Sequence, residues 1–116
     1  MKQASTLTRR LAEAQELHAA CALREAESAP LLFRLYTESF DNLRDYTQHY
    51  FKGATFLHGI GLWEGCTENV TIIEVVGTLD DLQNVVFLAG DIREANHQSS
   101  VLVTWQRLDG RLDVQS

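Results

Sequence analysis

The segment NVTIIEVVG, residues 69–77, constrains the fold more than any other part of the sequence. Its β-branched residues favour a strand. Alternate positions of a strand point to opposite faces of a sheet, and both faces are apolar here, with Ile72 and Val76 on one face and Ile73 and Val75 on the other. A strand that is apolar on both faces is normally covered on both sides. We therefore expect a sheet with something packed on each of its faces.

The segments around this strand alternate between strand and helix patterns. Apolar and aromatic runs without breakers predict strands, and apolar residues that recur every three or four positions predict helices. Thr78 and Asp81 have the spacing of a capping box, which marks the start of a helix. The predicted strands are 31–37, 54–63, 69–77 and 101–108, and the predicted helices are 40–51 and 80–96.

This order, β-α-β-β-α-β, is the split β-α-β pattern of the ferredoxin-like fold. It predicts an α+β domain with an antiparallel sheet of spatial order 4-1-3-2 and both helices on one face. Residues 6–27 are rich in Ala and Glu and predict an additional N-terminal helix, which ends before Pro30. We therefore divide the chain into an N-terminal helical extension, 1–30, and a ferredoxin-like domain, 31–116.

Length and charge exclude several classes of function. A chain of 116 residues is enough for one domain with its own core. Residues 1–30 carry four charges of each sign, so the whole net charge of −6 falls on residues 31–116. A nucleic-acid binder normally carries a basic patch, and an acidic surface is repelled by anionic lipids. We expect neither a nucleic-acid partner nor a membrane partner.

The start of the sequence and the cysteines indicate a cytoplasmic protein. MKQASTLTRR has no apolar core of a secretory signal, and no run of residues is long and apolar enough to span a membrane. Cys21 and Cys66 stand far apart and form no disulfide framework, which fits a reducing compartment.

The two-sided apolar strand also predicts self-association. Two helices can cover only one face of a four-stranded sheet, so the second face needs the N-terminal helix or another subunit. A bare apolar sheet would exceed what a monomer usually exposes. We expect a homo-oligomer that associates through this second face.

Three polar side chains are the first candidate site. A hairpin symmetric about Cys66 places His58 opposite Glu74, and the neighbouring first strand carries Arg34. Arg34, His58 and Glu74 are then aligned across three strands within an apolar wall, the composition of a small-ligand or acid/base site. The alternative is a salt bridge that fixes the register between strands or subunits.

The segment GIGLWEG, residues 59–65, is the second candidate. A strand follows it, whereas a phosphate-binding glycine loop leads into a helix. Its glycines therefore indicate a bulge or a close approach of another backbone. Trp63 is either a contact anchor at the rim of a binding site or a lid on its own core. The four histidines form no metal-binding pattern, so we expect no metal. Cys66 has no defined base, so we expect no nucleophilic catalysis, and we expect no cofactor.

Residues 31–105 resemble the small PII-like signalling proteins in three features. These are the β-α-β-β-α-β order, the G-x-G-x-W-x-G pattern that closes the second strand, and the apolar TIIEVVG strand after it. The resemblance implies three subunits that pack their sheets around an axis, with small ligands in the clefts between subunits. The long partner-binding loop of those regulators would lie between the second and third strands, where this chain has only about five residues. The glycine-rich nucleotide-binding loop of the family is not evident either.

Together these observations predict a non-enzymatic oligomeric module that binds a small molecule or a protein at a subunit boundary. Arg34, His58 and Glu74 would make polar contacts, with Trp63 at the rim. The alternative is a dimeric α+β-barrel enzyme in which Glu74 or His58 is the general base and Arg34 holds an anionic substrate. A third hypothesis is a structural or inhibitory protein whose N-terminal helix docks on a partner.

Overall fold

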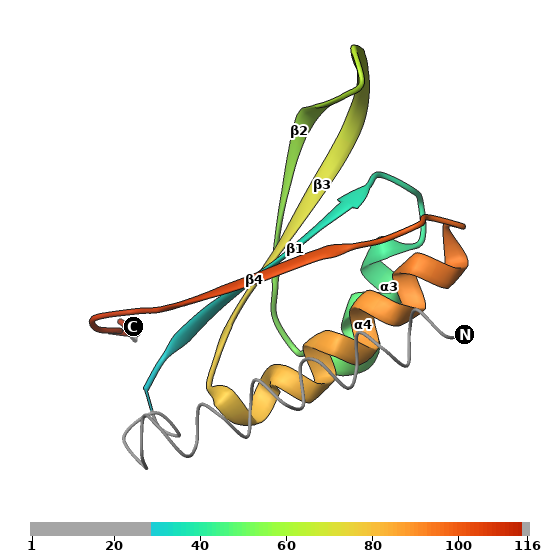
Figure 1. The fold of residues 1–116 in the computed structure, drawn as a ribbon. Coiled ribbons are helices and arrows are strands. Elements are labelled where there is room, and N and C mark those ends of the chain that lie inside the picture. Colours follow the sequence, from blue (N-terminus) through green and yellow to red (C-terminus); the bar gives the residue numbers. More distant parts are fainter. Residues whose placement is uncertain (1–28, 115–116) are drawn as a thin grey trace.

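The computed structural model describes residues 29–114, and they form a four-stranded antiparallel sheet with two helices over one of its faces (Figure 1). The α+β class is therefore confirmed. The predicted N-terminal helix lies outside the described residues. The elements in chain order are β1 (Leu31–Glu38), α3 (Leu43–Tyr50), β2 (Thr55–Trp63), β3 (Cys66–Gly77), the short 3-10 helix η1 (Leu79–Asp81), α4 (Leu82–Ala95) and β4 (Leu102–Arg107).

The strand order across the sheet is β2-β3-β1-β4. All neighbouring pairs are antiparallel, and β1 and β3 lie in the middle. Strand β3, which contains the segment 69–77 that is apolar on both faces, is therefore one of the central strands. The β2–β3 hairpin continues beyond the end of β1 and projects past the helices (Figure 1).

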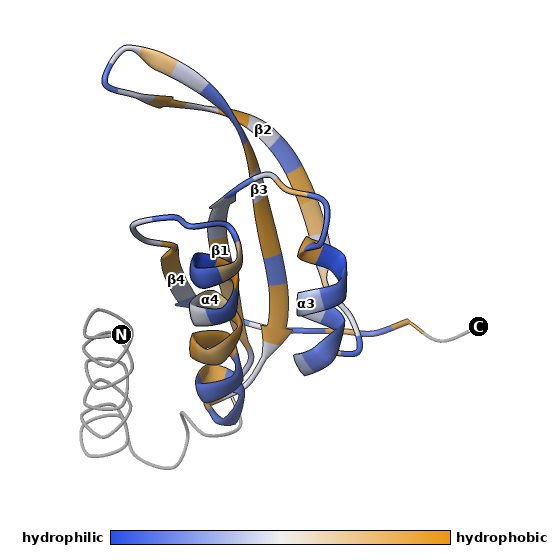
Figure 2. Cartoon of the chain, turned by 90° about the vertical axis from the view of Figure 1, so that its right-hand side faces the viewer, coloured by the Kyte–Doolittle hydropathy of each residue, from blue (hydrophilic) through white to orange (hydrophobic). Residues whose placement is uncertain are grey.

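The hydrophobic core lies between the sheet and the two helices. Phe33, Leu35 and Ile73 from the central strands are fully buried against Val85 and Ile92 of α4. These positions alternate along β1 and β3, so the intervening side chains point to the other face. Figure 2 shows both helices in front of the same side of the sheet, with the part of β3 behind them largely hydrophobic. We call the side away from the helices the open face.

The start of the second helical segment follows the sequence prediction. The backbone N–H of Thr78 donates to Asp81 Oδ2 at 2.8 Å, so Thr78 and Asp81 form a capping box around η1, which leads directly into α4. At the other helix, α3, the chain becomes helical only after Asn42. Ser39, in the connection before it, has its hydroxyl 2.7 Å from Thr71 Oγ1 on β3. The connection between β1 and α3 is therefore short and held to the sheet.

A two-residue turn joins β2 and β3. Trp63 pairs with Cys66, and the two residues between them, Glu64 and Gly65, have φ values of 48° and 81°. Positive φ at both central positions is typical of a type I′ turn, whose twist matches that of the flanking strands. Because loop length fixes the register of a hairpin, this turn determines which side chains of β2 share a face with those of β3.

One hydrogen bond ties α3 to α4 and provides a pH-dependent test of the packing. The Tyr50 hydroxyl donates to Asp91 Oδ2 at 2.5 Å, and this bond raises the pKa of Tyr50 to about 12. The neutral phenol is the form that is stabilised in the folded state, so the bond contributes fully below the ordinary tyrosine pKa of about 10. Its contribution is lost as the pH rises from about 10 to about 12.

We expect Tyr50→Phe to lower the free energy of unfolding by about 1–2 kcal/mol at neutral pH, because it removes a hydrogen bond to a carboxylate. The difference between wild type and variant should shrink above about pH 10, measured by urea unfolding at several pH values. Tyr46→Phe is the matched control, since Tyr46 packs its ring 6.2 Å from that of Phe40. A difference that stays constant up to about pH 11.5 would show that the Tyr50–Asp91 bond does not carry the effect.

Candidate functional site

The structure brings two of the four predicted site residues together. Arg34 and Glu74 are partners in the β1–β3 register, and Arg34 Nε donates to Glu74 Oε2 at 2.8 Å. The hydrogen bond to Glu74 raises the pKa of Arg34 above its ordinary value. Arg34 Nη1 also lies 3.5 Å from Gln106 Oε1 on β4. Both charges of the pair are thus largely neutralised at the centre of the open face.

His58 does not join this pair, so its predicted position opposite Glu74 is wrong. It lies opposite Thr71, and Thr55 lies opposite Glu74. The prediction assumes a hairpin centred on Cys66, whereas the actual turn is Glu64–Gly65, which shifts the register by three residues. An odd shift moves every side chain of one strand to the other face. His58 therefore lies on the helix side of the sheet, and Arg34 and Glu74 lie on the open face.

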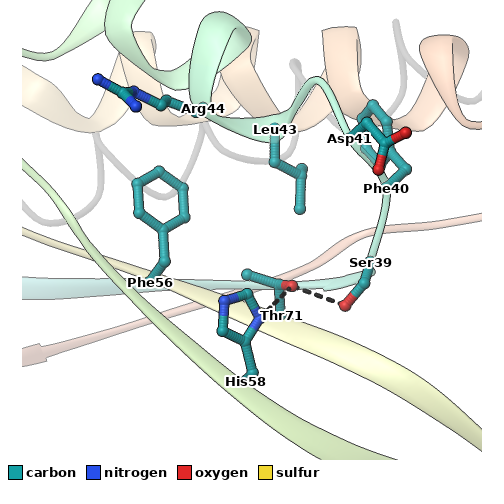
Figure 3. A pocket seen from close by; sticks show the side chains of 8 residues that line it. All are labelled: Ser39, Phe40, Asp41, Leu43, Arg44, Phe56, His58 and Thr71. Carbon is teal, nitrogen blue, oxygen red and sulfur yellow. Dashed lines mark hydrogen bonds between the residues drawn. The ribbon is translucent and has the colours of Figure 1, made fainter.

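His58 belongs to a recess on the helix side, which we call the His58 recess (Figure 3). Its ring nitrogen Nδ1 lies 3.2 Å from Thr71 Oγ1. The recess has a volume of about 410 Å³. It is lined by Ser39, Phe40, Asp41, Leu43, Arg44, Phe56, His58 and Thr71.

Trp63 stands at the tip of the hairpin and is 70 % exposed, so it is no lid on its own core. It lines a second recess, with a volume of about 310 Å³, which we call the Trp63 recess. Both volumes are of the size of small-molecule sites. The residues that line the Trp63 recess are Tyr36, Thr37, Glu38, Trp63, Glu68, Val70, Gln98, Ser99, Ser100 and Leu102.

The pleat of the sheet gathers the side chains of the Trp63 recess on the open face. Tyr36 and Glu38 alternate with the buried positions of β1, and Tyr36 is the partner of Leu102 on β4. On β3, Glu68 lies an odd number of positions from the helix-facing Thr71 and Ile73, so its side chain points to the open face. Two aromatic rings and two carboxylates thus line one recess that is open to solvent.

Two glycines of β2 adjoin the Trp63 recess on the open face. Gly59 is the partner of Val70 and Gly61 is the partner of Glu68, both on the open face. A Cβ atom at Gly61 would come within 2.6 Å of Val70 Cγ2, so a larger residue would displace that side chain. Val70 therefore packs over Gly61, and open backbone surface remains at Gly59, where an added Cβ would have nothing within 4 Å. The sequence indicates this close approach but not its place beside a recess.

A hydrogen-bonded corner fixes the rim of the Trp63 recess. Gln98 is only 7 % exposed, and its side chain donates to Thr37 Oγ1 at 2.6 Å. Its Oε1 accepts from the backbone N–H of Glu38 at 3.2 Å. The connection between α4 and β4 is thereby held to the end of β1. Glu38 and Tyr36 are presented from a rigid strand rather than from a loop.

Neither recess has the composition of a metal centre. Among residues 29–114 there is no group of three or more His, Cys, Asp and Glu side chains that could hold a metal ion. The helices in the same part of the chain include none with the length and hydropathy needed to cross a bilayer. The chemistry offered by the Trp63 recess is that of electron-rich rings and carboxylates, which attract cations.

Comparison with known proteins shows the fold of this chain but no family. No protein-family model matches the chain, and no curated protein matches it. A solved structure of a phage SAM lyase in complex with S-methyl-5'-thioadenosine is similar in fold, with a TM-score of 0.56. The similarity covers 68 % of this chain and 81 % of the lyase chain at 20 % sequence identity.

Proposed function

We propose that this protein associates with copies of itself through the open face and binds a small sulfonium nucleoside of the S-adenosylmethionine class in the Trp63 recess, at a subunit boundary. The observation that carries the proposal is the set of two aromatic rings and two carboxylates that line this recess, beside the open backbone of Gly59. A sulfonium ion is a soft, weakly hydrated cation, and aromatic faces and carboxylates are the groups that recognise such ions. The open backbone at Gly59 leaves room for a planar base to lie against it.

The fold supports the choice of ligand. A SAM lyase with a nucleoside thioether bound has a similar arrangement of elements. The strand order β2-β3-β1-β4 supports our assignment of this chain to the ferredoxin-like fold, with a resemblance to PII-like proteins. In that arrangement the open face is the side available to other subunits.

The surface of the open face supports self-association. Leu57, Val76 and Leu102 on this face are 43 %, 44 % and 58 % exposed. Arg34 and Glu74 neutralise one another among these apolar side chains. A paired charge can be buried at an interface at far lower cost than an isolated one. Since the Trp63 recess lies at the end of the same face, a second subunit would help to enclose it.

The matched pair S-adenosylmethionine and S-adenosylhomocysteine tests the proposal, because the second lacks the methyl group and the positive charge at sulfur. We expect the full chain to bind the sulfonium compound roughly ten-fold more tightly in isothermal titration calorimetry, a difference of about 1.4 kcal/mol. Glu68→Gln should reduce this preference to about two-fold, because it removes one of the carboxylates. Glu94→Gln, on the exposed side of α4, is the control and should bind like the wild type.

Equal affinity for the two compounds, or no binding of either, would contradict the proposal. A change in affinity of the same size in Glu94→Gln would assign the effect to net charge rather than to the recess.

A second candidate function is cleavage of S-adenosylmethionine, which the similarity in fold to a SAM lyase favours. Glu38 and Glu68 could then stabilise the positive charge of the substrate or accept a proton. Incubation of the wild type with S-adenosylmethionine, followed by mass spectrometry, separates the two candidates. Accumulation of S-methyl-5'-thioadenosine would show catalysis, and recovery of intact ligand at saturation would show a binding module.

A further inference from the structure

The His58 recess lies on the opposite side of the sheet from the Trp63 recess and plays no part in the proposed function. It opens between β2 and the beginning of α3 (Figure 3). Its volume of about 410 Å³ is the larger of the two. Cavities of this size that combine an apolar lining with a few convergent polar groups are typical of small-molecule sites.

The floor of the recess is a chain of three polar side chains. Ser39 Oγ lies 2.7 Å from Thr71 Oγ1, which lies 3.2 Å from His58 Nδ1. Thr71 is only 1 % exposed, so its hydroxyl is committed to these two partners. When Ser39 donates to Thr71 and Thr71 donates to Nδ1, the hydrogen of the neutral imidazole is on Nε2. Figure 3 shows this second ring nitrogen on the side of the ring that faces Phe56.

The walls of the recess are apolar and aromatic. Phe56 and Leu43 face each other across it, and Phe40 closes the end beside Asp41 (Figure 3). Leu43 is 4 % exposed and Phe56 is half-buried against the core. A flat ring placed against Phe56 would bury the exposed part of that side chain, whereas Leu43 has almost no surface left to cover.

The charged groups at the recess are separated. In Figure 3 the Arg44 guanidinium extends on the Phe56 side, and the Asp41 carboxylate lies at the other end and is directed away from His58. Arg44 and His58 Nε2 therefore present hydrogen-bond donors on opposite sides of the Phe56 ring (Figure 3). Donors of this kind recognise a carboxylate, which an arginine fork can bind through two parallel hydrogen bonds.

We infer that the His58 recess binds a small aromatic carboxylate. The ring of the ligand packs on Phe56, in front of Leu43, and its carboxylate accepts hydrogen bonds from Arg44. The net charge of −6 disfavours an anionic ligand in general, but this placement puts the anionic end next to Arg44 and away from the Asp41 carboxylate. The site is independent of the Trp63 recess.

Phenylacetate and its neutral analogue 2-phenylethanol test the inference, because they share the ring and differ in the carboxylate. Each is titrated into the 15N-labelled full chain and followed by two-dimensional NMR. We expect saturable shifts at the amides of Arg44, His58 and Thr71 with phenylacetate, and binding of 2-phenylethanol that is roughly ten-fold weaker. The amides of Trp63 and Glu68 should not shift, which separates this site from the proposed nucleoside site.

Arg44→Gln should weaken phenylacetate binding at least about five-fold and leave the affinity for 2-phenylethanol unchanged. Arg107→Gln, at the end of β4, removes the same charge elsewhere and should bind phenylacetate like the wild type. Equal binding of acid and alcohol, no saturable shift, or shifts centred on the Trp63 recess would each overturn the inference. The spectra of the free variants report whether they are folded.

Discussion

Replacing Ile72 by lysine is expected to convert the proposed homo-oligomer into a monomer. Ile72 lies near the middle of the open face, on a central strand between Leu57 of β2 and Tyr36 of β1. A lysine there remains hydrated in a single chain but would be buried without a partner in an oligomer. Burial of an unpaired charge costs several kcal/mol, so we expect the dissociation constant to rise by roughly 100-fold or more.

Sedimentation velocity over a wide range of protein concentration measures this effect directly. The wild type should sediment as an oligomer whose mass falls on dilution, and Ile72→Lys should sediment as a monomer with an unchanged circular dichroism spectrum. Leu112→Lys is the matched control, because Leu112 is 86 % exposed beyond the end of β4. A wild type that is monomeric at every concentration would contradict self-association through the open face.

The class of fold could be predicted from the sequence because its signals are local. The β-branched run 69–77 contains the central part of β3, and the capping box at Thr78 and Asp81 marks the start of the second helical segment. The apolar and aromatic run 31–37, which contains no breaker, lies within β1. Each of these patterns can be recognised from the residues of a single segment, because burial and backbone hydrogen bonding determine which residue types that segment contains.

The register of the β2–β3 hairpin could not be predicted in the same way. Glu64–Gly65 adopts the positive φ values of a type I′ turn without the Asn-Gly pair that usually marks one. The local pattern therefore suggests a longer connection, from Glu64 to Glu68, although β3 begins at Cys66. This difference separates His58 from Glu74 and places them on opposite faces. The pairing of Arg34 with Glu74 could be predicted, since it depends on β1 and β3 rather than on the turn.

The residues that line the Trp63 recess could not be predicted from the sequence, for a related reason. Local sequence places Glu68 in a loop, but as a strand residue it shares a face with Trp63 and Tyr36. Glu38 and Gln98 reach the recess only through the packing of the α4–β4 connection on β1, which no local pattern reveals. The spacing of Gly59, Gly61 and Trp63 does indicate that these three residues share one face of the sheet, because residues two apart in a strand point to the same side.

Phe33→Ala is expected to have the largest effect on the stability of the monomer. Phe33 is completely buried on the helix side of β1, with Val75 and Trp105 as its partners on the two neighbouring strands. Removal of a buried aromatic ring costs about 3–5 kcal/mol. Thermal unfolding followed by circular dichroism should therefore show a midpoint lower by roughly 15 °C or more. Phe33→Leu retains most of the apolar volume and should cost less than about 2 kcal/mol.

Leu102→Ala on the open face distinguishes the core from the proposed interface. Leu102 is 58 % exposed in one chain, so in the Ile72→Lys monomer its truncation should cost less than about 1 kcal/mol. In the wild type the same truncation also weakens association, and the loss of stability should increase with protein concentration. Phe33→Ala should instead lower the stability of both backgrounds by the same amount, because its contacts lie within one chain. If Leu102→Ala has equal effects in the two backgrounds at all concentrations, the open face does not bind a second subunit and the Trp63 recess must bind its ligand within a single chain.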